Sequence, residues 1–132
     1  MTIEVEQHRD HLERLLTNLG EGDWALQIVD SVEDWAASVN LPQRRVLIPA
    51  MAVRASDGRR IVVVRRLLTD VIQKAVLDGF LFRGQGDQPG LEDPLRFVEH
   101  LVLHEVAHHV LDTDDEEPCD AWAFSKMPGR VP

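Results

Sequence analysis

The segment from Pro94 to Leu111, PLRFVEHLVLHEVAHHVL, constrains the fold more than any other part of the chain. Pro94 suits the first turn of a helix, Asp93 can cap that turn, and no helix breaker follows before Asp112. Apolar residues lie nearly all round this predicted helix, which is typical of a helix in the middle of a domain. We therefore predict that the fold is built around residues 94–111.

This helix carries the pattern HExxH in His104, Glu105 and His108. On a helix the two histidines lie one turn apart and about 40° round the axis, so both imidazoles can reach one ion about 2 Å from each ring nitrogen. Glu105 would reach a water bound to that ion, whose pKa the ion lowers to about 7. A chance pattern is the alternative, but unpartnered polar groups in an apolar helix each cost about 1–3 kcal/mol. The pattern predicts a zinc-dependent hydrolase with Glu105 as its general base.

A zinc site in a hydrolase takes three protein ligands, so a third must come from elsewhere in the chain. The downstream segment DTDDEEPCDAWAFSKMP, residues 112–128, places Glu116 and Asp120 one turn apart on a predicted second helix. Asp114, Glu117 and Asp112 are also candidates, and a solvated acidic loop that caps a helix is the alternative for all of them.

These two blocks resemble the gluzincin-type metallopeptidases, and among them the small ImmA/IrrE-like domains. HEVAH at residues 104–108 looks like the zinc-binding helix of that family, and E-x-x-C-D-x-W-A from Glu116, followed by Met127-Pro128, looks like its second-helix pattern. The resemblance implies that Glu116 is the third zinc ligand and that Asp120 hydrogen-bonds the first histidine. It also implies a peptide substrate added to an edge strand. We rank Glu116 first as third ligand and Asp114 second.

The rest of the chain alternates between helix and strand signals. Before the central helix we expect an amphipathic helix over Glu4–Leu19, a strand over Trp24–Val29 and a short helix from Asp30-Ser31 through Trp35 to Val39. A second strand is expected over Arg45–Val53. It contains Pro49, which cannot donate a backbone hydrogen bond, so this strand belongs at a sheet edge.

Two interpretations remain for residues 61–80. Ile61 to Val64 is a β-branched run that can form the second arm of a hairpin after the turn Ser56-Asp57-Gly58, with a helix following it. Helical spacing extends from Phe80 back to Ile61, however, so the whole stretch can also be one helix. With either interpretation we predict an α+β, zincin-like fold. A small sheet of about three strands packs on the HExxH helix, and a ligand-bearing helix follows.

Composition limits the remaining possibilities. The chain has 132 residues and is expected to form a single domain, residues 1–132. Its net charge of −9 opposes nucleic-acid binding, and its apolar runs and acidic N-terminus predict neither a membrane span nor a signal peptide. The single Cys119 excludes an intramolecular disulfide, which favours the cytoplasm. We expect a peptide or protein substrate. The alternative is a non-catalytic or latent zinc-binding domain that acts through a protein partner.

Overall fold

The computed structural model describes residues 2–41, 48–86 and 88–128. Along the chain these residues form the elements β1 (Ile3–Glu4), the 3-10 helix η1 (Val5–His8), α1 (Arg9–Asn18), β2 (Trp24–Val29), α2 (Val32–Ser38), β3 (Ala50–Arg54), β4 (Arg60–Arg65), β5 (Leu67–Leu68), α3 (Asp70–Phe82), the 3-10 helix η2 (Pro89–Glu92), α4 (Pro94–Val110) and α5 (Glu116–Lys126). The prediction of a mixed α+β fold with a small sheet is confirmed.

The main sheet has the strand order β2-β4-β3. β3 and β4 form the predicted antiparallel hairpin, whereas β2 pairs with β4 in parallel, which the sequence analysis did not predict. In the described part of the chain β3 is therefore an edge strand, as Pro49 indicated. The predicted strand began at Arg45, but residues 45–47 lie outside the described residues, and β3 begins at Ala50.

The stretch from residue 61 to residue 80 is strand followed by helix, so the single-helix interpretation is wrong. β4 pairs along its whole length with β2 and β3, and Thr69 caps α3 by accepting a hydrogen bond from the Ile72 amide. The N-terminal helix also differs from its prediction. It begins at Arg9 rather than Glu4 because Ile3 and Glu4 pair with Leu68 and Leu67 of β5.

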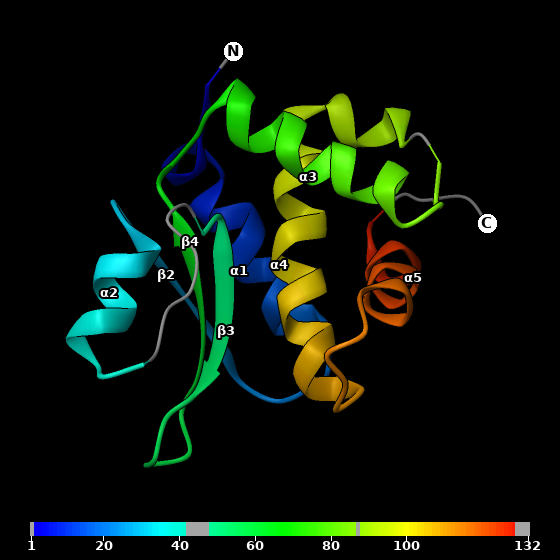
Figure 1. Cartoon of the computed structure of the whole chain (residues 1–132). Coiled ribbons are helices and arrows are strands. Elements are labelled where there is room, and N and C mark those ends of the chain that lie inside the picture. Colours follow the sequence, from blue (N-terminus) through cyan, green and yellow to red (C-terminus); the bar gives the residue numbers. More distant parts are fainter. Residues whose placement is uncertain (1, 42–47, 87, 129–132) are drawn as a thin grey trace.

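Helix α4 occupies the centre of the molecule, with the sheet on one side and α5 on the other (Figure 1). Asp93 caps its first turn by accepting from the Arg96 amide, as predicted. The sheet separates two groups of apolar side chains. Val62 and Val64 pack in the main core with α4, while Val63 packs with Val32 of α2 on the other face. None of the helices in the described part of the chain has both the length and the apolar character needed to cross a bilayer.

The buried face of α4 also contains polar side chains. His100 and His104 are buried next to Asp120 of α5, which is also buried, whereas the buried Glu99 lies 2.7 Å from His11 of α1. Each buried polar group needs a partner, because leaving it unpaired costs about 1–3 kcal/mol. The polar residues between α4 and α5 therefore mark the region where a functional site is to be sought.

Candidate metal centre

Three of the predicted site residues meet where α4 faces the start of α5. The Nε2 atoms of His104 and His108 lie 3.2 Å apart, and the carboxylate of Glu116 spans them. Its Oε2 is 3.1 Å from Nε2 of His104, and its Oε1 is 3.2 Å from Nε2 of His108. The helix places the two histidines one turn apart, and α5 begins at Glu116, so its first residue points back at them.

Partners on the other ring nitrogens fix which atoms carry protons. Nδ1 of His108 lies 2.8 Å from the backbone carbonyl of Thr113, and Nδ1 of His104 lies 2.7 Å from Oδ1 of Asp120. Both neighbours are acceptors, which assigns the proton of each neutral imidazole to Nδ1. Each Nε2 then presents a lone pair. Two imidazole Nε2 atoms and a carboxylate therefore converge on one point, where either a metal ion or a proton on one imidazole would be stabilised.

The spacing of these atoms fits a bound metal ion. Ligand bonds of about 2.0 Å at tetrahedral angles put neighbouring ligand atoms about 3.3 Å apart. The separations of 3.1, 3.2 and 3.2 Å within the triad of His104, His108 and Glu116 are close to that value. These residues, which we call the metal triad, can hold a metal ion.

A second group, formed by His100, His104 and Asp120, also has the spacing of metal ligands and shares His104 with the metal triad. All three of its members are buried, and Oδ1 of Asp120 lies 3.1 Å from Nε2 of His100. Nδ1 of His104 faces this group and Nε2 faces the metal triad. Because His108 and Glu116 of the metal triad are partly exposed, whereas all three members of the second group are buried, we assign the second group to holding His104 in place.

Asp120 is itself held by residues that the sequence analysis missed. Arg83 Nη2 and Gln85 Nε2, from the end of α3 and the loop that follows, donate to its Oδ2 at 2.9 and 3.1 Å. No role was predicted for either residue. An arginine after an apolar helix is ordinary at a helix C-terminus, so no sequence signal identified Arg83 as a partner of Asp120.

The charges of the metal-free site follow from these contacts. Burial is the largest influence on His104 and opposes its protonation, but hydrogen bonds with Asp120 and Glu116 outweigh burial and raise the pKa of His104 to about 10. The hydrogen bond with His104 lowers the pKa of Glu116. Burial raises the pKa of Asp120, but the neighbouring histidines outweigh it, and the net shift is strongly downward. In the metal-free protein the positive charge of protonated His104 therefore offsets the negative charges of Asp120 and Glu116.

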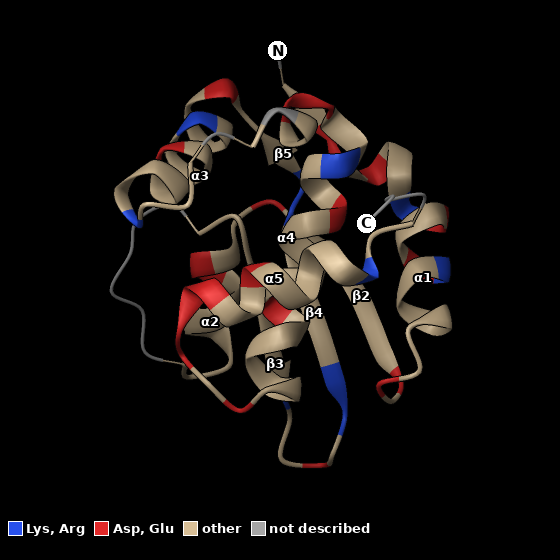
Figure 2. Cartoon of the chain, turned by 90° about the vertical axis from the view of Figure 1, so that its right-hand side faces the viewer, with Lys and Arg blue, Asp and Glu red and all other residues tan. Residues whose placement is uncertain are grey.

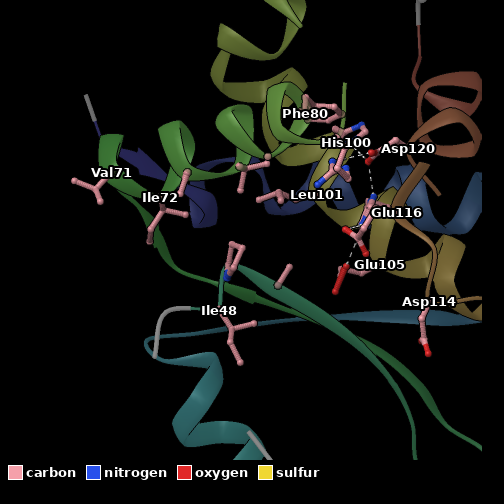
Figure 3. A pocket seen from close by; sticks show the side chains of 17 residues that line it. Ile48, Val71, Ile72, Phe80, His100, Leu101, Glu105, Asp114, Glu116 and Asp120 are labelled. Atoms are coloured by element: carbon pink, nitrogen blue, oxygen red, sulfur yellow. Dashed lines mark hydrogen bonds and ion pairs between the residues drawn. The ribbon is translucent and has the colours of Figure 1, made fainter. Parts of the chain in front are cut away.

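Glu105 lies beside the metal triad but outside it. Its Oε2 is 3.9 Å from Nε2 of His104 and 3.9 Å from Nε2 of His108. It lines a cleft of about 630 Å³ together with His104, Glu116 and Asp114 (Figure 3). This volume lies within the range of about 300–1,000 Å³ typical of ligand pockets. His104 and Glu116 of the triad therefore face a cavity large enough for a substrate.

The competing third ligands do not reach the triad. Asp114 lines the cleft and Glu117 is exposed, but neither belongs to a group with metal-ligand spacing among the described residues. Both belong to the acidic stretch of residues 112–117 that joins α4 to α5 (Figure 2). Cys119 is buried, with Sγ 3.4 Å from Nδ1 of His108, and burial raises the pKa of its thiol to about 11. A thiol that stays protonated is a poor ligand.

Comparisons of the chain with protein-family models, with curated proteins and with solved structures give no match, so its function has to be inferred from these residues.

Proposed function

We propose that the protein is a zinc-dependent metallopeptidase of the gluzincin type, with His104, His108 and Glu116 as zinc ligands and Glu105 as general base. The observation that carries this proposal is the convergence of two imidazole Nε2 atoms and a carboxylate within 3.1–3.2 Å of one another. A glutamate stands 3.9 Å from both imidazoles at the wall of an open cleft.

The donor set supports zinc over other common metals. Calcium and magnesium prefer sites built from oxygen, whereas two imidazole nitrogens with one carboxylate form a three-ligand set used by catalytic zinc. Because the known catalytic zinc sites keep a fourth position open for water, access from a cleft is expected. The side chain of Glu116 is 42% exposed, which supports a site open on that side.

The proposed reaction is hydrolysis of a peptide bond. A zinc ion held by the triad would lower the pKa of a water molecule and polarise the substrate carbonyl. Glu105 is placed to accept the proton of that water and to pass it to the leaving amine. Asp120 keeps the proton of His104 on Nδ1, so that Nε2 stays available as a ligand, and the Thr113 carbonyl does the same for His108.

The proposed zincin-like fold agrees with the placement of the elements. The HExxH helix α4 packs against β3, which is an edge strand, and α5 follows with Glu116 in its first turn. Pro49 and Ala50 at the start of β3 line the cleft. A peptide that pairs with the exposed edge of β3 would therefore lie across the site, as the resemblance to the small ImmA/IrrE-like domains implies.

The alternative is a zinc domain that is non-catalytic or latent and acts through a protein partner. A purely structural zinc site takes four protein ligands and is closed to solvent. The cleft at the triad and the position of Glu105 support the catalytic proposal over this alternative.

The variant Glu105→Gln tests the proposal. It keeps the size of the side chain and removes the base, so zinc content should stay at one ion per chain while peptide hydrolysis falls by about 10²–10⁴-fold. Glu117→Gln, at an exposed glutamate of α5, is the matched control and should keep full activity. Full activity of zinc-loaded Glu105→Gln would refute the role of Glu105, and zinc-loaded wild-type protein that cleaves no peptide of a diverse library would refute the peptidase.

A further inference from the structure

The cleft lined by His104 and Glu116 of the metal triad has an apolar end formed by α3. Figure 3 shows Glu105, Glu116 and Asp114 toward one end, and Val71, Ile72 and Ile48 toward the other. From α3 the lining residues are Val71, Ile72, Ala75, Val76, Gly79 and Phe80. They form two adjacent rows at a spacing of four residues, so one face of the helix lines the cleft. We call this face the α3 wall.

The α3 wall leaves apolar surface exposed to solvent inside a concavity. Ile72 and Phe80 are buried, whereas Val71 is 72% exposed and Ala75 is also exposed. Apolar surface that lines a cavity is favourable to cover, by about 25 cal/mol for each Å² removed from water. Ala75 and Gly79 are small, which leaves space beside the larger side chains. A ligand with an apolar group of moderate size would fill this space.

The backbone of β3 indicates that the ligand is an extended peptide. The Pro49 carbonyl accepts from the Arg65 amide at 2.9 Å, and the Ala55 amide donates to the Arg59 carbonyl at 2.7 Å. Odd-numbered residues of β3 thus direct their backbone groups to β4, and Ala50 and Ala52 direct theirs to the outer edge. One backbone group of this outer edge already has a partner, because Nε2 of His109 lies 2.8 Å from the Ala52 carbonyl.

His109 therefore restricts where a peptide can pair. It occupies the Ala52 carbonyl, whereas Ala50 lines the cleft next to Ile48 and opposite the α3 wall. Ala50 is buried but lines the same cleft as His104 and Glu116, so a peptide paired there would enter this cleft with alternate side chains on opposite sides. One set of these side chains then faces the α3 wall.

We propose that the α3 wall is a specificity subsite for an apolar side chain of a peptide substrate, such as leucine, with Val71, Ala75 and Val76 as the determinants. This proposal rests on the proposed peptidase function, whose substrate class it narrows. An acidic side chain is disfavoured at the subsite, because Val71, Ala75 and Val76 offer a carboxylate no hydrogen-bond donor and remove part of its hydration.

Peptide binding tests the subsite without any need for turnover. The probes are acetyl-Gly-Gly-Leu-Gly-Gly-amide and the same peptide with aspartate in place of leucine. Each is titrated up to millimolar concentration into metal-free and zinc-loaded Glu105→Gln protein, and the methyl NMR signals of Val71, Ala75 and Val76 are followed. We expect the leucine peptide to move these signals and to bind at least tenfold more tightly than the aspartate peptide, which corresponds to about 1.4 kcal/mol.

Two variants and a control accompany this titration. Ala75→Trp fills the subsite and should abolish the preference for leucine, whereas Leu81→Trp, at a 52% exposed position of α3 that does not line the cleft, should keep it. Val71→Asp changes an exposed position, so the protein still folds, and its charge should weaken binding of the leucine peptide at least fivefold.

The possible results distinguish failure of the proposed subsite from failure of the proposed peptidase activity. Methyl signals that stay in place, equal binding of the two peptides, or a preference that survives both Ala75→Trp and Val71→Asp would overturn the subsite even if zinc-dependent cleavage were found. Selective binding of the leucine peptide by a protein that cleaves no peptide would uphold the subsite and refute the peptidase.

Discussion

The substitution Asp120→Asn removes a buried negative charge on which four side chains converge. Arg83 and Gln85 donate to one oxygen at 2.9 and 3.1 Å, and the other oxygen lies 3.1 Å from Nε2 of His100 and 2.7 Å from Nδ1 of His104. Asparagine keeps the shape but carries no charge, and its amide nitrogen places a donor against donors. The variant therefore tests whether this carboxylate holds the first histidine of the candidate site.

We expect the variant to lose about 3 kcal/mol of unfolding free energy in the metal-free protein at pH 6. Removing one partner of a buried ion pair costs about 3–5 kcal/mol. The side chain of Arg83 is 30% exposed, so water replaces part of its lost interaction and the lower end of this range applies. The melting temperature should fall by roughly 10 °C or more for a domain of this size.

The pH dependence of the stability loss tests the role of Asp120 more specifically than the size of the loss does. An unfolded histidine titrates near 6.5, and the folded metal-free protein raises the pKa of His104 to about 10. Stability from protonated His104 is therefore fully present below pH 6.5 and is lost as the pH rises toward 10. Without the Asp120 carboxylate the pKa of His104 falls, because one of the groups that raise it is lost, and this alkaline loss shrinks. The difference between wild type and variant should be largest near pH 6 and smaller at pH 10.

On the acid side the sign is reversed. The pKa of Asp120 is lowered in the folded protein, so its contribution is present above the unfolded value of 3.8 and is lost as the pH falls below it. Urea unfolding followed by circular dichroism from about pH 2 to pH 10 measures both the acid and the alkaline change in stability. The exposed Asp115→Asn is the control and should change stability by less than about 0.5 kcal/mol. A loss below 0.5 kcal/mol in Asp120→Asn, or a loss that stays constant from pH 6 to pH 10, would refute the reasoning.

Three further perturbations probe the same site. Zinc at one hundred times its dissociation constant should raise the unfolding free energy by about 2.7 kcal/mol and a chelator should reverse this, whereas an unchanged thermal melt would contradict the metal site. Arg83→Ala should weaken zinc affinity about tenfold, because Asp120 loses its counter-charge, while Arg59→Ala at a 72% exposed side chain should leave the affinity unchanged. The Cys119 thiol is buried with a pKa raised to about 11, so Ellman's reagent should react with it far more slowly in native protein than in 6 M urea, and equal rates would disagree with its burial.

Local sequence signals predicted much of the fold. The strand Trp24–Val29 and the helix α4 follow from short-range patterns, and Ser31 caps α2 from the position expected in the sequence. The parallel pairing of β2 with β4 could not be read in this way, because it joins strands separated by α2 and β3, and a strand pattern does not specify its distant partner.

The candidate site also combines residues that local sequence patterns indicated with residues that they did not. His104, Glu105 and His108 are fixed relative to one another by helix geometry, so their spacing alone indicated the site. Glu116 needed the additional resemblance to a known family, because the loop between the helices allows several carboxylates to approach. Arg83 and Gln85 were missed because they reach Asp120 from 37 and 35 positions away in the sequence, through packing of α3 that no local pattern encodes.

The most direct test of the central claim is the zinc content per chain, measured by native mass spectrometry on wild type, Glu116→Gln and Glu117→Gln after zinc loading and removal of excess metal. Both substitutions replace a glutamate with glutamine, at neighbouring positions, but only Glu116 lies 3.1–3.2 Å from both imidazoles. We predict one zinc in wild type and in Glu117→Gln, and loss of zinc in Glu116→Gln. Wild-type protein that takes up no zinc, or zinc retained equally by Glu116→Gln, would contradict the metal triad.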